Sequence, residues 1–108
     1  MKNIQYNFQN KHCVITGGAQ GIGLQIAKNF LNSGATVTVW DYSNEGLEKA
    51  RAALQSFADR VHFQQVDVTK SSACIQAASA LKTPVDILIN NAGITRDKSF
   101  NKIGRAHV

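Results

Sequence analysis

The sequence predicts an α/β fold of the Rossmann type, a doubly wound parallel sheet with helices on both faces. Three observations lead to this prediction. Short β-branched and apolar runs alternate with helical patterns of roughly 10 to 15 residues, a glycine-rich segment joins the first run to the first helix, and an acidic residue follows the second run. Parallel strands need such crossover helices, because a tight hairpin cannot join them. The predicted order is βαβαβαβ, truncated after the fourth strand.

The first predicted strand, residues 13–16, is β-branched and apolar, and it leads directly into the glycine-rich segment. The helix that follows has one apolar stripe, because hydrophobic side chains recur at helical spacing at Ile22, Ile26 and Phe30. Gly34 is predicted to end this helix, since glycine adopts the left-handed conformation after a helix without steric strain.

The second predicted strand, residues 36–40, precedes a helix that Ser43 or Asn44 can cap. Glu45 lies in the first turn of this helix, where the helix dipole favours a carboxylate. Its buried face is predicted to extend to the end of the helix and comprises Leu47, Ala50, Leu54 and Phe57.

The third predicted strand covers residues 61–66. Thr69 or Ser71 can cap the third helix, which is expected to continue through Leu81 before a proline breaks it. Residues 85–89 then form the fourth predicted strand. The whole pattern describes one domain without an internal repeat or a linker.

Composition and charge exclude several classes of protein. The 108 residues are 44% hydrophobic, and no apolar run approaches the roughly 18 residues of a membrane-spanning helix. Residues 1–11 lack the apolar stretch of a secretion signal, so a cytoplasmic protein is expected. Residues 94–108 carry +3 of the net charge of +5, which leaves a nearly balanced body and argues against a nucleic-acid partner.

The spacing of the cysteines and histidines indicates neither a disulfide framework nor a metal site. Cys13 and Cys74 lie 61 positions apart and are expected to be buried as small hydrophobic residues. His12 and His62 are expected to be packed or surface residues rather than ligands. Asp86 is interpreted as a surface acid at the start of a strand.

The glycine-rich segment has the properties of a phosphate-binding loop. A pyrophosphate needs backbone N–H groups aimed at it and a helix N-terminus behind it, and Gly17, Gly21 and Gly23 allow that approach. Leu24 stands where a Walker loop would have lysine, so that loop type is excluded. Asp41 follows Gly23 by 18 residues and can accept hydrogen bonds from an adenosine ribose. The alternatives are a plain tight turn for the glycines and a helix cap or solvated acid for Asp41.

At these residues the sequence resembles the short-chain dehydrogenase/reductases. Residues 16–23 (TGGAQGIG) look like the cofactor loop of that family, and residues 90–93 (NNAG) look like its second hallmark. Asp67 and Val68 match the pair that holds the adenine ring in the family, although Asp67 could also be only a helix cap. The cofactor contacts that the resemblance implies are Gly17, Gln20, Gly21, Ile22, Gly23, Asp41, Asp67, Val68, Asn90, Ala92 and Gly93.

The resemblance covers about residues 8–102 and implies an oxidoreductase that uses NAD(H), with NADP(H) less favoured. Residues 94–100 look most like the branch of 3-oxoacyl-carrier-protein and acetoacetyl-CoA reductases, which implies reduction of a ketone, such as a 3-oxoacyl thioester, or the reverse reaction. A complete member of the family is expected to form a homo-oligomer.

The catalytic Tyr-x-x-x-Lys pair of the family is absent from this chain. Tyr6 and Tyr42 are its two tyrosines, and neither is followed four residues later by lysine. We therefore assign no catalytic residue and expect residues 1–102 to be the amino-terminal half of one domain. Residues 103–108 (IGRAHV) depart from the apolar helical pattern expected there and can be back-translated to a sequencing-library adapter, so they are expected to be a non-native tail.

Two other functions fit the same sequence less well. A non-catalytic dinucleotide sensor would keep the nucleotide loop and lack the tyrosine. A sugar-nucleotide epimerase usually has a glycine in its loop where this chain has Gln20, so that function ranks last.

Overall fold

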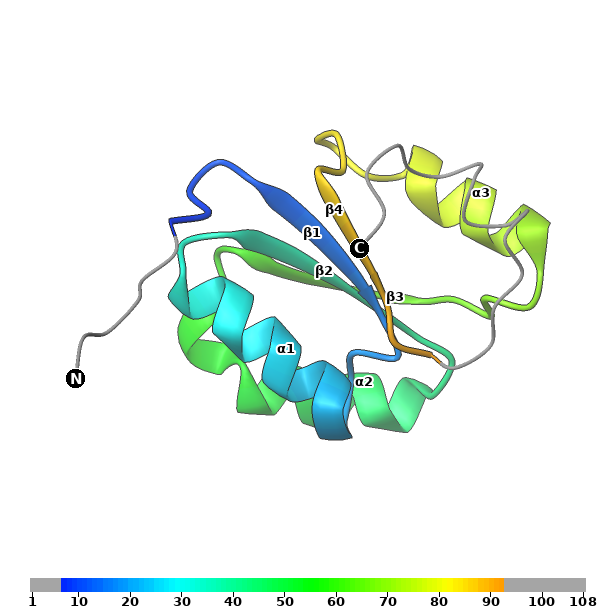
Figure 1. The fold of residues 1–108 in the computed structure, drawn as a ribbon. Coiled ribbons are helices and arrows are strands. Elements are labelled where there is room, and N and C mark those ends of the chain that lie inside the picture. The colour runs from blue at the N-terminus through cyan, green and yellow to red at the C-terminus, as the bar shows by residue number, and fades with distance from the viewer. Residues whose placement is uncertain (1–6, 93–108) are drawn as a thin grey trace.

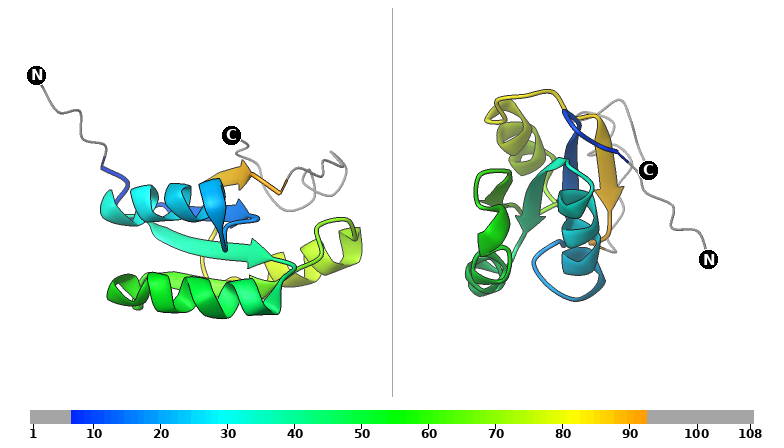
Figure 2. Two further views of the ribbon diagram at one scale, coloured as in Figure 1. Left: turned by 90° about the horizontal axis from the view of Figure 1, so that it is seen from below. Right: turned by 90° about the vertical axis from the view of Figure 1, so that its left-hand side faces the viewer.

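The structure is a computed structural model that describes residues 7–92, and within them the predicted parallel sheet is confirmed (Figure 1). Gly93, residues 94–100 and the tail at 103–108 lie outside the described residues. Four strands pair in the order β3-β2-β1-β4, all parallel, and the arrows of β1, β2 and β4 point the same way in the left view of Figure 2. The strands are β1 (His12–Thr16), β2 (Thr36–Asp41), β3 (Val61–Gln65) and β4 (Ile87–Asn90).

Helices cover both faces of this sheet. The helix α1 (Gly21–Asn32) joins β1 to β2 and α2 (Asn44–Ala53) joins β2 to β3, and both lie on one face. The helix α3 (Ser71–Ser79) packs on the opposite face (Figure 1). This is the doubly wound arrangement that the alternation of strands and helices predicts.

Each face of the sheet has its own hydrophobic core, because alternate strand residues point to opposite sides. On the face of α1 and α2, buried strand residues such as Cys13, Ile15 and Val39 pack against helix residues that include Leu31 and Leu47. On the face of α3, the buried cluster contains Val14, Trp40, Val66, Val68, Cys74 and Leu88. Both cysteines are fully buried and unpaired, as expected.

Two of the predicted helix boundaries are confirmed by local hydrogen bonds. Gly34 has φ +98°, and its N–H donates to the Leu31 carbonyl oxygen at 3.1 Å after the end of α1. Ser43, rather than Asn44, caps α2, because its Oγ accepts the Gly46 N–H at 2.9 Å.

Other boundaries differ from the sequence-based expectation. The helix α2 ends at Ala53, and a 3₁₀ turn at Gln55–Phe57 replaces its predicted last turn. The helix α3 begins after Lys70, which makes no side-chain capping bond, and it ends at Ser79 rather than Leu81.

The strand β4 also begins two residues later than predicted. Asp86 Oδ2 accepts the His12 N–H at 2.8 Å, and the Asp86 N–H donates to the His12 carbonyl oxygen at 2.9 Å. The side chain thus takes the place of a backbone partner, and the regular ladder starts with the pair Cys13 and Ile87. Asp86 therefore has a structural role at the start of the strand, away from the site described below.

Two kinds of feature are absent from residues 7–92. None of the helices there is long and apolar enough to cross a membrane. The same residues contain no group of three or more His, Cys, Asp or Glu side chains that could hold a metal ion.

Candidate functional site

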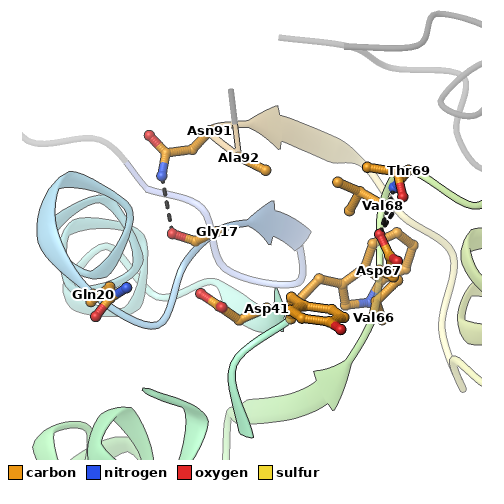
Figure 3. A pocket seen from close by; sticks show the side chains of 11 residues that line it. Gly17, Gln20, Asp41, Val66, Asp67, Val68, Thr69, Asn91 and Ala92 are labelled. Atoms are coloured by element: carbon orange, nitrogen blue, oxygen red, sulfur yellow. Dashed lines mark hydrogen bonds between the residues drawn. The ribbon is translucent and has the colours of Figure 1, made fainter. Parts of the chain in front are cut away.

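A cavity of about 580 Å³ lies at the carboxyl ends of the strands (Figure 3). Thr16 pairs with Trp40 of β2 on one side and with Asn90 of β4 on the other. The strands β1, β2 and β4 therefore end at the same edge of the sheet, and the segments that follow them lie together. The cavity is lined by Gly17, Gln20, Trp40, Asp41, Tyr42, Val66, Asp67, Val68, Thr69, Asn91 and Ala92. Loops in this position are where open α/β sheets bind their ligands.

The loop after β1 has the backbone conformation that its glycines permit. Gly17 and Gly21 have φ +64° and +59°, in the left-handed region that favours glycine. No atom lies within 4 Å of where a Cβ at Gly21 would be, so this position faces open space. A Cβ at Gly23 would instead overlap the Gly17 carbonyl oxygen and lie 2.6 Å from Asn91 Nδ2. Gly21 thus keeps the approach to the loop open, and Gly23 allows close packing beneath it.

The first turn of α1 is suited to bind an anion. The N-cap residue Gln20 makes no side-chain capping bond, and the first turn contains no acidic residue. The first N–H groups of a helix have no partner within the helix and carry partial positive charge. Ile22 lies in this turn and is 75% exposed. This end of α1 can therefore accept a phosphate group from solvent.

Hydrogen bonds of Thr16 and Asn91 connect the end of β4 to β1 and the loop after it. The fully buried Thr16 Oγ1 accepts the N–H groups of Asn91 and Ala92 at 3.0 and 3.1 Å. Asn91 Nδ2 donates to the Gly17 carbonyl oxygen at 3.0 Å, a bond drawn in Figure 3. These bonds fix one wall of the cavity.

Asp41 faces the same cavity from the end of β2. Its Oδ2 accepts the Ala19 N–H from the loop after β1 at 3.1 Å, and its Oδ1 accepts the Ser43 N–H at 3.0 Å. A carboxylate offers about four acceptor positions, so two remain after these bonds. Two hydroxyl groups of a ribose could use them.

Asp67 and Thr69 form a polar corner after β3. Asp67 Oδ1 accepts both the hydroxyl of Thr69, at 2.5 Å, and its N–H, at 3.0 Å. These bonds, the hydroxyl foremost, hold the pKa of the Asp67 carboxyl below its ordinary value. The alternative interpretation of Asp67 as a cap of α3 is not what the structure shows, because Lys70 is the N-cap residue and Asp67 closes the turn before it.

The remaining wall of the cavity is apolar. Trp40, Val66 and Val68 are buried in one cluster, with Ala92 packed against it. The Trp40 indole N–H donates to Gln64 Oε1 at 2.6 Å, so its polar atom is satisfied within the protein. This wall presents an apolar surface to the cavity, which suits an aromatic base.

The structure brings most of the predicted site residues together. Six line the cavity, namely Gly17, Gln20, Asp41, Asp67, Val68 and Ala92. Gly21, Ile22 and Gly23 follow Gln20 directly in the first turn of α1. Asn90 does not line the cavity, and its exposed side chain lies within 3.3 Å of the Thr16 hydroxyl. Gly93 is outside the described residues.

Five lining residues were not among the predicted cofactor contacts: Trp40, Tyr42, Val66, Thr69 and Asn91. Asn91 belongs to the NNAG segment, but the sequence does not show whether Asn90 or Asn91 reaches Gly17. Tyr42 follows Asp41 and is 70% exposed, but no motif marks it. For Trp40 the sequence predicts only a place in a strand.

A second cavity, of about 420 Å³, lies at the opposite ends of the strands. It is lined by His12, Thr36, Thr38, His62, Gln64, Ala80, Leu81, Lys82 and Thr83. The His12 ring lies within hydrogen-bond distance of Thr38 Oγ1 (2.7 Å) and Thr83 Oγ1 (3.0 Å) and is buried, whereas His62 is exposed. None of the predicted site residues lines this cavity.

Comparison with known proteins assigns the class. The model of the short chain dehydrogenase family matches residues 11–108. The chain therefore belongs to the short-chain dehydrogenase family, whose members are oxidoreductases that use nicotinamide dinucleotides.

Individual relatives agree with this assignment. The chain is 42% identical over 92 residues to the 3-oxoacyl-(acyl-carrier-protein) reductase FabG of Chlamydia trachomatis, covering 82% of this chain and 37% of that protein. It is 31% identical over 103 residues to gluconate 5-dehydrogenase of Gluconobacter oxydans, covering 93% and 40%. A solved structure of 2-keto-3-deoxy-D-gluconate dehydrogenase from Streptococcus agalactiae matches with TM-score 0.75 at 30% identity, covering 85% and 36%. The chain thus spans well under half the length of each of these relatives.

Proposed function

We propose that this chain forms the dinucleotide-binding half of an NAD(H)-dependent oxidoreductase that reduces a ketone to a secondary alcohol or catalyses the reverse reaction. The observation that carries the proposal is the convergence, in one cavity, of a glycine loop, a helix N-terminus, a carboxylate and an apolar wall. These are the groups that a pyrophosphate, a ribose and an adenine ring require.

The residues that would hold the adenosine half of the cofactor occupy different sides of the cavity. The backbone of Gly21 and Ile22 would bind the pyrophosphate at the start of α1. Asp41 would accept the ribose hydroxyls, and Asp67 with Val68 would hold the adenine ring against the apolar wall.

The other half of the cofactor would lie near the end of β4. Asn90, Ala92 and Gly93 would contact it there, and Gly17 and Gly23 would allow the backbone to approach closely. When bound, the nicotinamide would donate or accept the hydride. The role of this chain is to bind and orient the cofactor, and we assign no proton donor within it.

We further propose that NAD(H) is preferred to NADP(H). Asp41 places a negative charge where the 2′-phosphate of NADP(H) would lie, and Gln20 brings no cation into the loop to offset it. The similarity to FabG supports a 3-oxoacyl thioester as the substrate.

Equilibrium binding tests the proposal. We expect NADH and ADP-ribose to bind the purified protein in isothermal titration calorimetry, and Ile22→Asp to weaken both by about tenfold or more, since the new carboxylate lies beside the pyrophosphate. The fold should survive this change, because an acid in the first turn of a helix is favourable and Ile22 is 75% exposed.

Ile75→Asp is the matched control, because Ile75 is 42% exposed on α3 and does not line the cavity. Its affinity for ADP-ribose should equal that of the unmodified protein. Failure of the unmodified protein to bind either ligand at millimolar concentration, or equal affinities of Ile22→Asp and Ile75→Asp, would overturn the proposed function.

A further inference from the structure

The second cavity, at the amino ends of the strands, is separate from the proposed nucleotide site. Within the described part of the chain, no residue lines both cavities. Strand residues form one side of the second cavity, and the segment that joins α3 to β4 forms the other. Its volume of about 420 Å³ is in the range of pockets that hold small organic molecules. The cavity is therefore larger than a single inorganic ion requires.

The buried ring of His12 fixes one wall of this cavity. His12 is 5% exposed, and its Nε2 lies 2.7 Å from Thr38 Oγ1. Its Nδ1 lies 3.2 Å from the Pro84 carbonyl oxygen and 3.0 Å from Thr83 Oγ1. Because a carbonyl oxygen can only accept, Nδ1 carries a proton. These contacts hold the segment before β4 against β1 and β2, so the cavity is formed before a ligand enters and little ordering is needed on binding.

Three lining side chains offer hydrogen-bond donors to the cavity. They are the Lys82 ammonium, the Thr36 hydroxyl and the His62 imidazole. Among residues 7–92, none of these three side chains has a hydrogen-bond or ion-pair partner. Donors without a protein partner are available to a ligand that accepts hydrogen bonds.

The charge at the lining is positive. Lys82 contributes a full positive charge, and no aspartate or glutamate of residues 7–92 lines the cavity. Asp86 is four positions away in the sequence, but its Oδ2 accepts the His12 N–H at 2.8 Å. A carboxylate group on a ligand would therefore meet an unpaired cation and no acidic side chain at the lining.

The end of α3 lies beside Lys82 and supplies the apolar part of the lining. The carbonyl groups at the end of a helix carry partial negative charge, which would oppose an anion. Here the Ala77 carbonyl oxygen accepts Gln64 Nε2 at 3.1 Å and the Ala80 N–H at 3.2 Å, which offsets that charge. Ala80 and Leu81 then present methyl groups to the cavity.

We propose that the second cavity binds an organic carboxylate with a short hydrocarbon chain. The carboxylate accepts hydrogen bonds from Lys82 and Thr36, and the hydrocarbon chain packs against Leu81. Because the two cavities lie at opposite ends of the strands, this ligand and a dinucleotide can be bound at the same time. The site does not depend on the proposed function.

The test is an NMR titration of the nitrogen-15-labelled protein with butyrate at constant pH and ionic strength. We expect saturable shifts of the amides of Thr36, His62 and Lys82, and none at Gly17 and Gly21. Butyramide has nearly the same shape but no charge. It should bind about fivefold more weakly or less, since it loses the charge-assisted hydrogen bond to the ammonium.

Two variants test the donors. Lys82→Met keeps the length of the side chain and removes its charge, so it should weaken butyrate binding by about fivefold or more. Its matched control is Lys49→Met, because Lys49 is an exposed lysine of α2 that lines neither cavity. Thr36→Val keeps the β-branched shape and should weaken binding by about threefold. Lys82 is exposed, so its replacement should leave the fold intact, and the NMR spectrum of each variant checks this.

The inference would be overturned if butyrate caused no saturable shifts at the second cavity, or if butyramide bound equally well. Equal affinities of Lys82→Met and Lys49→Met for butyrate would also overturn it. Inorganic phosphate that bound the same residues more tightly than butyrate would contradict the role given to the hydrocarbon chain and Leu81. None of these results bears on ADP-ribose binding, so a failure here is distinguishable from a failure of the proposed function.

Discussion

Gly23 is the residue that sets how closely α1 packs beneath the loop after β1. Any Cβ there would overlap the Gly17 carbonyl oxygen, a backbone atom that cannot move without shifting β1. Gly21, two residues earlier, needs glycine for a different reason, because its φ is +59° while the space around it is open. The two glycines of one motif thus have separate physical roles.

We predict that Gly23→Ala lowers the free energy of unfolding by about 3 kcal/mol or more, because overpacking against backbone is not relieved by side-chain motion. Gly21→Ala should lower it by about 1–2 kcal/mol, the strain of a left-handed alanine. Urea unfolding of both variants measures the difference. Equal losses would show that the close approach at Gly23 does not matter to stability.

The low pKa of the Asp67 carboxyl depends first on the Thr69 hydroxyl. We therefore predict that Thr69→Val raises this pKa toward its ordinary value, whereas Thr69→Ser leaves it low. Because the folded-state pKa is lowered, the stabilisation is present above the unfolded-state pKa and is lost as the pH falls through the folded-state pKa. Carbon-detected NMR titration of Asp67 follows the shift, and an identical pKa in Thr69→Val would refute the assigned cause.

Most of the site residues could be predicted from the sequence because their roles depend on local spacing. The loop glycines and Asp41 follow strands directly, so their positions are given once the strands are recognised. Asn91 and Trp40 could not be assigned in that way. Whether Asn90 or Asn91 reaches Gly17 depends on the register of β4 against β1, which the sequence does not reveal.

At the scale of elements, the strand and helix cores were predictable and several of their ends were not. Leu54 and Phe57 continue the apolar spacing of α2, but a 3₁₀ turn fits that spacing as well as an α-helix does. Val85 is apolar like the strand after it, yet the bond from His12 N–H to the Asp86 side chain delays the ladder to Ile87. A tertiary hydrogen bond therefore decided where β4 begins.

The Thr16 hydroxyl at the end of β1 accepts the two N–H groups that directly follow β4. We predict that Thr16→Val, which has nearly the same shape, lowers the free energy of unfolding by about 2 kcal/mol, since it leaves the amides of Asn91 and Ala92 without this acceptor. Thr16→Ser keeps the hydroxyl and should lose less than about 1 kcal/mol. Urea unfolding of Thr16→Val and Thr16→Ser measures the two losses of unfolding free energy. Equal losses would contradict the role given to the hydroxyl.

At the scale of the whole molecule, one buried cysteine lies in each of the two hydrophobic cores of the sheet. Burial raises the pKa of the Cys13 thiol to about 12 on the face of α1 and α2. On the face of α3, burial and then the charge of Asp67 raise the pKa of the Cys74 thiol. Both thiols are therefore held in their unreactive protonated form.

We predict that neither thiol reacts readily with Ellman's reagent at pH 8 in the folded protein, and that both react after unfolding in urea. Because the Cys13 pKa is raised on folding, its contribution to stability is complete below the ordinary thiol pKa of 9.0 and is lost as the pH rises from there towards about 12. Comparison of Cys13→Ala with the unmodified protein across that range isolates this contribution. Rapid labelling of either thiol in the native protein would contradict the burial of both cysteines.

We propose above that the cavity at the carboxyl ends of the strands binds the adenosine diphosphate part of NAD. The most direct measurement is a two-dimensional NMR titration of the nitrogen-15-labelled protein with ADP-ribose. We expect saturable shifts of the amides of Gly17, Gly21 and Val68. The amides of His62 and Lys82, which line the opposite cavity, should not shift. Shifts confined to the opposite cavity, or no saturable shifts at all, would contradict it.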